Sequence, residues 1–149
     1  HGIRDPLWSR GLGDVYKRQD SHFTHSAWRN TPVEQGGVGS VPFPMVADMT
    51  REITSAYGVL SEPGNSYYPA GVAMRATFVI DQQGIVRHQI VNDEPLGRSV
   101  DEVVRIVDAL QFFEEHGQVC PAGWNKGDAG MVTTSWGVAS YLSEHADAL

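Results

Sequence analysis

The single cysteine of this 149-residue chain, Cys120, is the residue with the clearest potential for chemistry. It lies in the run EHGQVCPAGW (115–124), where glycine and proline interrupt regular structure. We therefore expect a reachable thiol, although free cysteine is often a small buried hydrophobic residue and that alternative stays open. Nothing beside it in the sequence forces its pKa far below the ordinary value of about 8.5. Such a thiol is suited to attack an oxidised sulfur atom.

Arg75 is the second candidate. It stands near the start of an apolar run, Ala73–Ile80, on the same strand face as Thr77 and Val79. An arginine in such a run must reach solvent, a carboxylate or an anionic site. By residue type alone, a plain ion pair is the more ordinary interpretation.

Three other patterns are weaker evidence for a functional site. His22 and His25 have no nearby carboxylate or cysteine to complete a metal site, so we expect no metal. The glycines at 36–39 lack the lysine and hydroxyl residue of a phosphate-binding loop. His116 near Cys120 leaves open a cysteine hydrolase, although no nucleophile motif surrounds the cysteine.

Composition narrows the class of protein. The length predicts one domain, and 41% hydrophobic with 19% charged residues is typical of a globular protein. A net charge of −7 with scattered Lys and Arg argues against binding to nucleic acid or to an anionic membrane. No apolar run approaches the roughly 18 residues of a membrane span. One cysteine excludes an intrachain disulfide, and we expect a reducing, cytoplasmic location.

The secondary-structure signals predict a helix, a strand, a helix, a hairpin and further helices. Ser99 and Glu102 form a capping box before a helical apolar pattern, and two β-rich runs flank a turn at 81–84. The expected elements are a helix from Asp20 or Ser21 to Pro32, an extended segment at 41–47, a helix capped by Asp48 and ending at Gly58, strands at 73–80 and 85–91, a helix from Ser99 to His116, and a short helix from Ser135. This order predicts an α/β sheet covered by helices.

Residues 1–19 fit no element. They begin without Met and show neither a helical nor a strand period. We expect a non-native or disordered leader, similar to translated adapter sequence, and exclude it from reasoning about the fold.

Three runs together resemble a known family, the typical 2-Cys peroxiredoxins (the alkyl hydroperoxide reductase C family). They are the Cys120 run, the strand GVAMRATFVID (71–81) and the run VNDEPLGRSVDE (91–102). The resemblance covers residues 20–149 and is that of a C-terminal fragment, because the peroxidatic cysteine and its helix are missing.

The resemblance implies a thioredoxin-like sheet flanked by helices, with its N-terminal part missing and a C-terminal arm. It divides the chain into the leader 1–19, a partial thioredoxin-like core at 20–113 and a resolving-cysteine arm at 114–149. It also implies that Cys120 is the resolving cysteine and that Arg75 points into the peroxide site.

The implied function is a thiol-dependent peroxidase that reduces hydrogen peroxide and organic hydroperoxides. The implied partners are a second subunit in a homodimer or decamer and a thioredoxin-like reductant, with no cofactor. The chain alone is expected to be inactive because nothing in it supplies the first step. The alternative is a non-catalytic thioredoxin-fold dimerisation module with an open sheet edge.

Overall fold

A computed structural model describes residues 20–64 and 67–145 of the chain, and the predicted leader at 1–19 lies outside this part. The chain separates after Arg98 into two compact units. Within the described residues, no helix is both long enough and apolar enough to span a bilayer.

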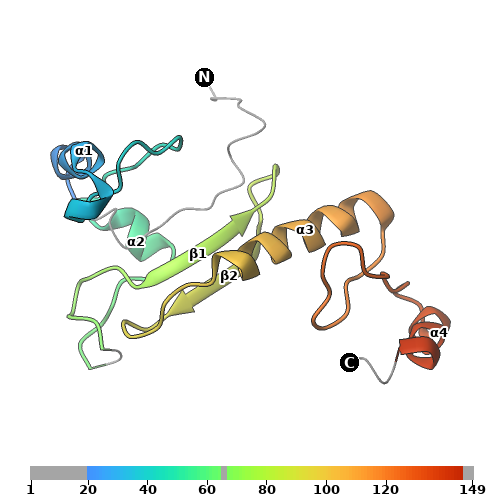
Figure 1. The fold of residues 1–149 in the computed structure, drawn as a ribbon. Helices are drawn as coiled ribbons and strands as arrows, with labels where there is room; N and C mark the ends of the chain where they lie inside the picture. The colour runs from blue at the N-terminus through green and yellow to red at the C-terminus, as the bar shows by residue number, and fades with distance from the viewer. Residues whose placement is uncertain (1–19, 65–66, 146–149) are drawn as a thin grey trace. The chain divides into compact units, whose positions relative to one another are not determined.

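The first unit opens with the predicted helix, α1 (His22–Asn30), drawn in blue in Figure 1. Ser21 caps it, because its hydroxyl accepts a hydrogen bond of 3.2 Å from the Thr24 amide. The chain then makes a short 3-10 turn, η2 (Val33–Gln35), and folds back on the helix. There the Trp28 indole donates to the Gly36 carbonyl across 3.0 Å, which fixes the glycine loop against α1.

The extended segment expected at 41–47 does not form a strand. It is irregular and bends at Pro42 and Phe43, and among the described residues it has no strand partner. The two prolines supply no amide donor for a sheet ladder, which is the physical reason that this part of the prediction is wrong.

The second helix, α2 (Glu52–Ala56), is shorter than expected, and its N-cap position is Arg51 rather than the predicted Asp48. Arg51 takes a left-handed backbone conformation, φ 63°, so the helix cannot extend back to Met49. The Asp48 carboxylate nevertheless reaches the first turn and accepts bonds from the amides of Ile53 and Thr54. Gly58, with φ 66°, follows the helix as predicted.

The hairpin is confirmed. Strand β1 (Arg75–Ile80) pairs antiparallel with β2 (Val86–Asn92), from Arg75 opposite Asn92 to Ile80 opposite Val86, with a bulge near the turn. Strand β1 is buried on both faces, whereas β2 is largely exposed. The core of this unit gathers Val59, Ala73, Ala76 and Phe78, with Met74 and Ile80 packed against them.

The second unit is built on one long helix. Helix α3 (Val100–His116) begins at the predicted capping box, where the Ser99 hydroxyl accepts from the Glu102 amide across 3.2 Å. Gly117 ends it in a left-handed conformation, φ 67°, as expected for a helix C-terminus. A loop then leads to α4 (Ser135–His145), drawn in red in Figure 1.

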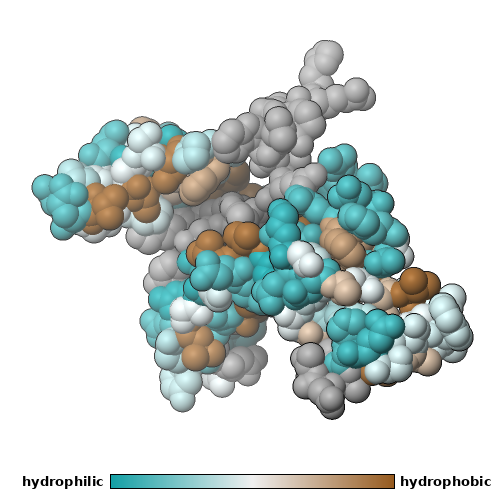
Figure 2. Space-filling model, turned by 45° about the vertical axis from the view of Figure 1, so that its right-hand side comes forward, coloured by the Kyte–Doolittle hydropathy of each residue, from teal (hydrophilic) through white to brown (hydrophobic). Residues whose placement is uncertain are grey.

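Apolar residues remain exposed in both units. Figure 2 shows brown hydrophobic residues scattered among teal hydrophilic ones at the surface. The most exposed of the large ones are Phe23, Tyr67 and Trp136. Scattered single residues of this kind are ordinary on protein surfaces and do not by themselves define a binding patch.

Candidate functional site

The backbone around Cys120 is held by an isolated β-bridge. The Val119 amide donates to the Met131 carbonyl across 2.9 Å, and the Met131 amide donates back across 2.8 Å. Cys120 follows the bridge directly, in the loop that lies between these two residues. The cysteine is therefore anchored on one side and belongs to irregular structure, as its sequence setting predicts.

The thiol itself is half-buried. Its Sγ donates a long, weak hydrogen bond of 3.7 Å to the carbonyl of Ala109 on α3. Burial raises the pKa of the Cys120 thiol, and the nearby Arg105 cation offsets only part of that rise. A thiol with a raised pKa is largely protonated at neutral pH, which fits a resolving thiol better than a peroxide-attacking one.

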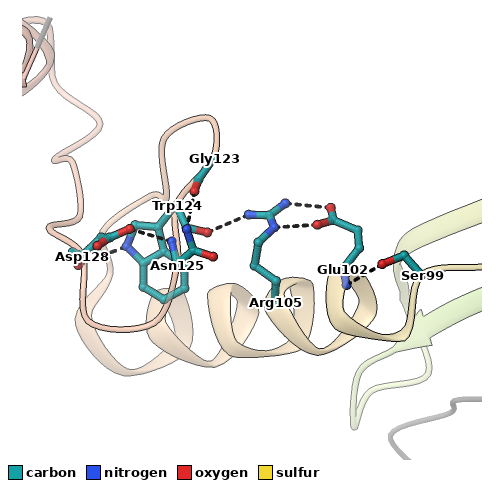
Figure 3. A network of polar contacts seen from close by, with 7 residues as sticks. All are labelled: Ser99, Glu102, Arg105, Gly123, Trp124, Asn125 and Asp128. Atoms are coloured by element: carbon teal, nitrogen blue, oxygen red, sulfur yellow. Dashed lines mark hydrogen bonds and ion pairs between the residues drawn. The ribbon is translucent and has the colours of Figure 1, made fainter. Parts of the chain in front are cut away.

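A polar network ties the loop to α3 (Figure 3). The Arg105 guanidinium makes a two-bond contact with the Glu102 carboxylate, at 2.7 and 2.8 Å. Its remaining nitrogen, Nη1, donates to the carbonyl of Trp124 across 2.9 Å. Hydrogen bonding to Glu102 raises the pKa of Arg105, so the cation is permanent in this network.

Trp124 fixes the loop from its own side. Its side chain is 2% exposed, and its indole donates to the Asp128 carbonyl across 3.1 Å. The ring also packs against Phe112 of α3, with centroids 5.0 Å apart. A buried, hydrogen-bonded tryptophan is a strong anchor because it removes much apolar area from water.

His116 does not pair with the cysteine. Its ring stacks on Phe112 at 4.5 Å, and its Nδ1 lies 3.1 Å from the Phe112 carbonyl. The thiol, in contrast, is directed to Ala109. The geometry therefore gives no support to the cysteine hydrolase alternative, which needs a histidine positioned as a base for the sulfur.

Arg75 lies at the first position of β1, in the other unit. Its amide donates to the Tyr68 hydroxyl across 3.1 Å, and its guanidinium donates to the carbonyl of Glu94. On the same strand face, Thr77 and Val79 are buried. The guanidinium is thus held by the loop that follows β2, and both its role in a peroxide site and the ion-pair alternative remain predictions.

The groups that could hold a metal ion are spread out in the described part of the chain. There, no three His, Cys, Asp or Glu side chains gather closely enough to bind one. His25 is 4% exposed and belongs to the packed side of α1. That the protein binds no metal stays a prediction.

Comparison with known proteins decides the family. Residues 16–89 match the AhpC/TSA family, and residues 109–144 match the C-terminal domain of 1-Cys peroxiredoxin. Alkyl hydroperoxide reductase C of Helicobacter pylori is 55% identical over 137 residues, which are 92% of this chain and 66% of that protein. This chain belongs to the peroxiredoxins of the AhpC/TSA family.

Two further relatives of this peroxiredoxin support the same family and fold. Bovine Peroxiredoxin-2 is 47% identical over 85% of the chain and 60% of its own length. Reduced 2-Cys peroxiredoxin of Plasmodium vivax superposes with a TM-score of 0.75 at 44% identity, over 83% of this chain and 61% of that one. The thioredoxin-like α/β fold is therefore confirmed, and the chain spans 60 to 66% of the length of these curated relatives.

Sequence reasoning found Cys120 and Arg75 but missed the network around Arg105. The signal was present, because an Arg three residues after a Glu on a helix is placed to pair with it. What the sequence could not show is that the same guanidinium also reaches the Trp124 carbonyl, 19 residues further along the chain.

Proposed function

We propose that this chain serves in a thiol-dependent peroxidase that reduces hydrogen peroxide and organic hydroperoxides, with Cys120 as its resolving thiol. The observation that carries the proposal is the setting of that thiol: half-buried, in a loop beyond a long helix, with its Sγ beside the Ala109 carbonyl. The names of the relatives, alkyl hydroperoxide reductase C and Peroxiredoxin-2, support the same activity.

The proposed step forms a disulfide between an oxidised cysteine and a reduced one. A peroxidatic cysteine of another subunit, once oxidised to sulfenic acid, is attacked by the Cys120 thiolate. An S–S bond forms and the S–O bond breaks, and the hydroxyl leaves as water with a proton from the medium. The sulfenic sulfur is reduced and Cys120 is oxidised. A thioredoxin-like dithiol then reduces the disulfide and becomes oxidised itself.

The 149 residues contain one cysteine, so the peroxidatic cysteine of the proposed step lies outside them. Arg75 would orient the peroxide with its fixed positive charge, which favours negative charge on sulfur and on the leaving oxygen. We place the reaction in the cytoplasm, in a homodimer or a decamer. Oligomers occur among the neighbours, since a Plasmodium yoelii relative modified at its N-terminus forms an artifactual octamer.

The test mixes the purified chain with a 2-Cys peroxiredoxin that retains its peroxidatic cysteine but carries Ser in place of its resolving cysteine. On addition of one equivalent of hydrogen peroxide, we expect a disulfide-linked heterodimer on a non-reducing gel. The matched control is Cys120→Ser, which should give none. Trapping of the sulfenic acid by dimedone without any heterodimer would contradict the proposal.

The chain alone should consume no peroxide with thioredoxin, its reductase and NADPH. Turnover that disappears in Cys120→Ser would show instead that Cys120 reacts with peroxide directly.

A second candidate, a non-catalytic dimerisation module, is favoured by one observation. Among the described residues β2 pairs only with β1, so its other edge carries no strand. An open edge can add a strand from a second copy. Sedimentation of Cys120→Ser distinguishes the peroxidase from the dimerisation module. A stable dimer of this variant, together with no disulfide exchange activity in the parent chain, would support the module.

A further inference from the structure

Several contacts fasten the loop that carries Cys120 to α3, and the side chain of Arg105 makes one of them. Arg105 binds Glu102 with two nitrogens and the Trp124 carbonyl with the third. Glu102 is in turn fixed at the start of the helix, where its amide donates to Ser99. The guanidinium therefore spans from the first turn of α3 to the loop beyond the cysteine (Figure 3).

We propose that Arg105 is a positioning residue that clamps the loop 117–131 against α3 and thereby controls access to the Cys120 thiol. Its link with catalysis rests on the proposed function, but its effect on access does not. The clamp acts through the backbone of Trp124, four residues after the cysteine, and involves no contact between Arg105 and a substrate.

Two other contacts also hold the loop against α3. The Trp124 ring packs on Phe112 and is almost fully buried, which anchors its side chain, whereas Arg105 binds the Trp124 backbone. Lys126 pairs with Asp108 across 2.9 Å, yet the Lys126 side chain is 75% exposed. Exposed pairs of this kind contribute little to stability because water and salt screen them.

The contacts of Arg105 should hold the loop more firmly than the exposed Lys126–Asp108 pair. The Arg105 side chain is 25% exposed, so it is better shielded from water than Lys126. A two-bond Arg–carboxylate contact also fixes the direction of the guanidinium, and its third bond is then made without further loss of freedom. Removing the guanidinium leaves the Trp124 carbonyl without this donor, which should favour opening of the loop.

The clamp also explains how the thiol can be half-buried in a glycine- and proline-containing loop. With the loop fastened, Sγ rests near the Ala109 carbonyl and within the influence of the Arg105 charge. With the loop open, the thiol leaves α3 and becomes available to another molecule. Access to the sulfur is thus set by an opening equilibrium rather than by the cysteine's immediate neighbours in sequence.

The experiment measures alkylation of Cys120 by iodoacetamide in the full chain, followed by intact mass. Alkylation rates are measured at a pH above the pKa of Cys120. There the thiol is fully ionised, so the rate depends only on access to the sulfur. We expect Arg105→Gln to raise the rate about tenfold, the factor that corresponds to about 1.4 kcal/mol. Lys126→Gln is the matched control, because it removes the exposed pair from the same loop, and it should change the rate less than about twofold.

Two further variants separate clamping from a general loss of structure. Arg105→Lys keeps a donor but cannot make the two-bond contact, so its rate should fall between those of the parent and Arg105→Gln. Glu102→Gln keeps the cation and the Ser99 cap while loosening the guanidinium, so it should raise the rate by about threefold. Helical circular dichroism should be unchanged throughout. If Arg105→Gln unfolds α3, the alkylation rate of Glu102→Gln tests the clamp in its place.

Rates for both Arg105→Gln and Glu102→Gln within twofold of the Lys126→Gln control would overturn the clamp. Failure of the heterodimer test with an intact effect on alkylation would instead remove the proposed function and leave the clamp standing. If both hold, Arg105→Gln should also form the mixed disulfide faster than the parent chain.

Discussion

The Asp48 carboxylate accepts two hydrogen bonds from Thr54, one of 2.8 Å from its amide and one of 2.6 Å from its hydroxyl. Both residues are buried, at 3% and 0% exposure, and the Ile53 amide adds a third bond to the same carboxylate. This small group of contacts fixes the start of α2, where Arg51 leaves the helix in a left-handed conformation. It holds a short helix that has little intrinsic stability of its own.

Asp48→Ala should therefore destabilise the chain. The change leaves the buried Thr54 hydroxyl and two helix amides without their acceptor, and we expect a loss of about 1–3 kcal/mol in the free energy of unfolding. Urea denaturation followed by circular dichroism measures it. Asp20→Ala, at an exposed position, is the control and should leave the midpoint unchanged. Equal midpoints for the two variants would show that the Asp48 cap is energetically unimportant.

The same carboxylate should make stability depend on pH. Burial alone would raise the pKa of Asp48, but the hydrogen bonds from Thr54, Ile53 and Glu52 outweigh burial and lower it. A folded-state pKa below the unfolded value of about 3.9 stabilises the fold above that value, and the contribution is lost as the pH falls through the folded pKa. Unfolding free energies of the parent chain and Asp48→Asn, measured from pH 6 down to pH 2, should converge at the acid end. A constant difference across that range would rule out the linkage.

Cys120 should react more slowly at neutral pH in the folded chain than in the unfolded chain. Burial raises the pKa of the thiol, so less thiolate is present at pH 7. The sign of the linkage is opposite to that of Asp48: the contribution to stability is complete below the unfolded pKa and is lost as pH rises through the folded value. Alkylation rates from pH 6 to 11, with and without urea, should give a higher midpoint for the folded chain. Coincident midpoints would contradict the assignment.

Gly37 should tolerate no side chain. A Cβ built there lies 1.8 Å from the carbonyl oxygen of Thr31, at the point where the loop returns to α1. Because the obstacle is backbone, Gly37→Ala must displace the loop, and we expect a loss of about 1–3 kcal/mol. Gly97→Ala is the matched control, since a Cβ there meets no atom within 4 Å and the backbone is not left-handed. Thermal unfolding followed by circular dichroism compares the two variants, and similar melting temperatures would refute the clash.

Local sequence signals determined the elements well where the signal is itself a local interaction. Ser21 and Ser99 cap their helices through the side-chain bonds that the sequence predicts, and Gly117 ends α3 as expected. The hairpin is similarly local, because Asp81 accepts from the amides of Gln83 and Ile85 within its own turn. The segment 41–47 differs: its two prolines supply no amide donor to a sheet ladder, and whether a run becomes a strand also depends on a partner that the run does not contain.

For the site, the sequence by itself determined the reactive group and its kind of setting: one thiol, after a helix, among glycine and proline. Only the tertiary structure decided how available that thiol is, since its pKa and exposure depend on Ala109 and Arg105, which are 11 and 15 positions earlier in the chain. The physical reason is that chemical identity belongs to a residue, whereas burial and electrostatic influence come from whatever the folded chain brings beside it.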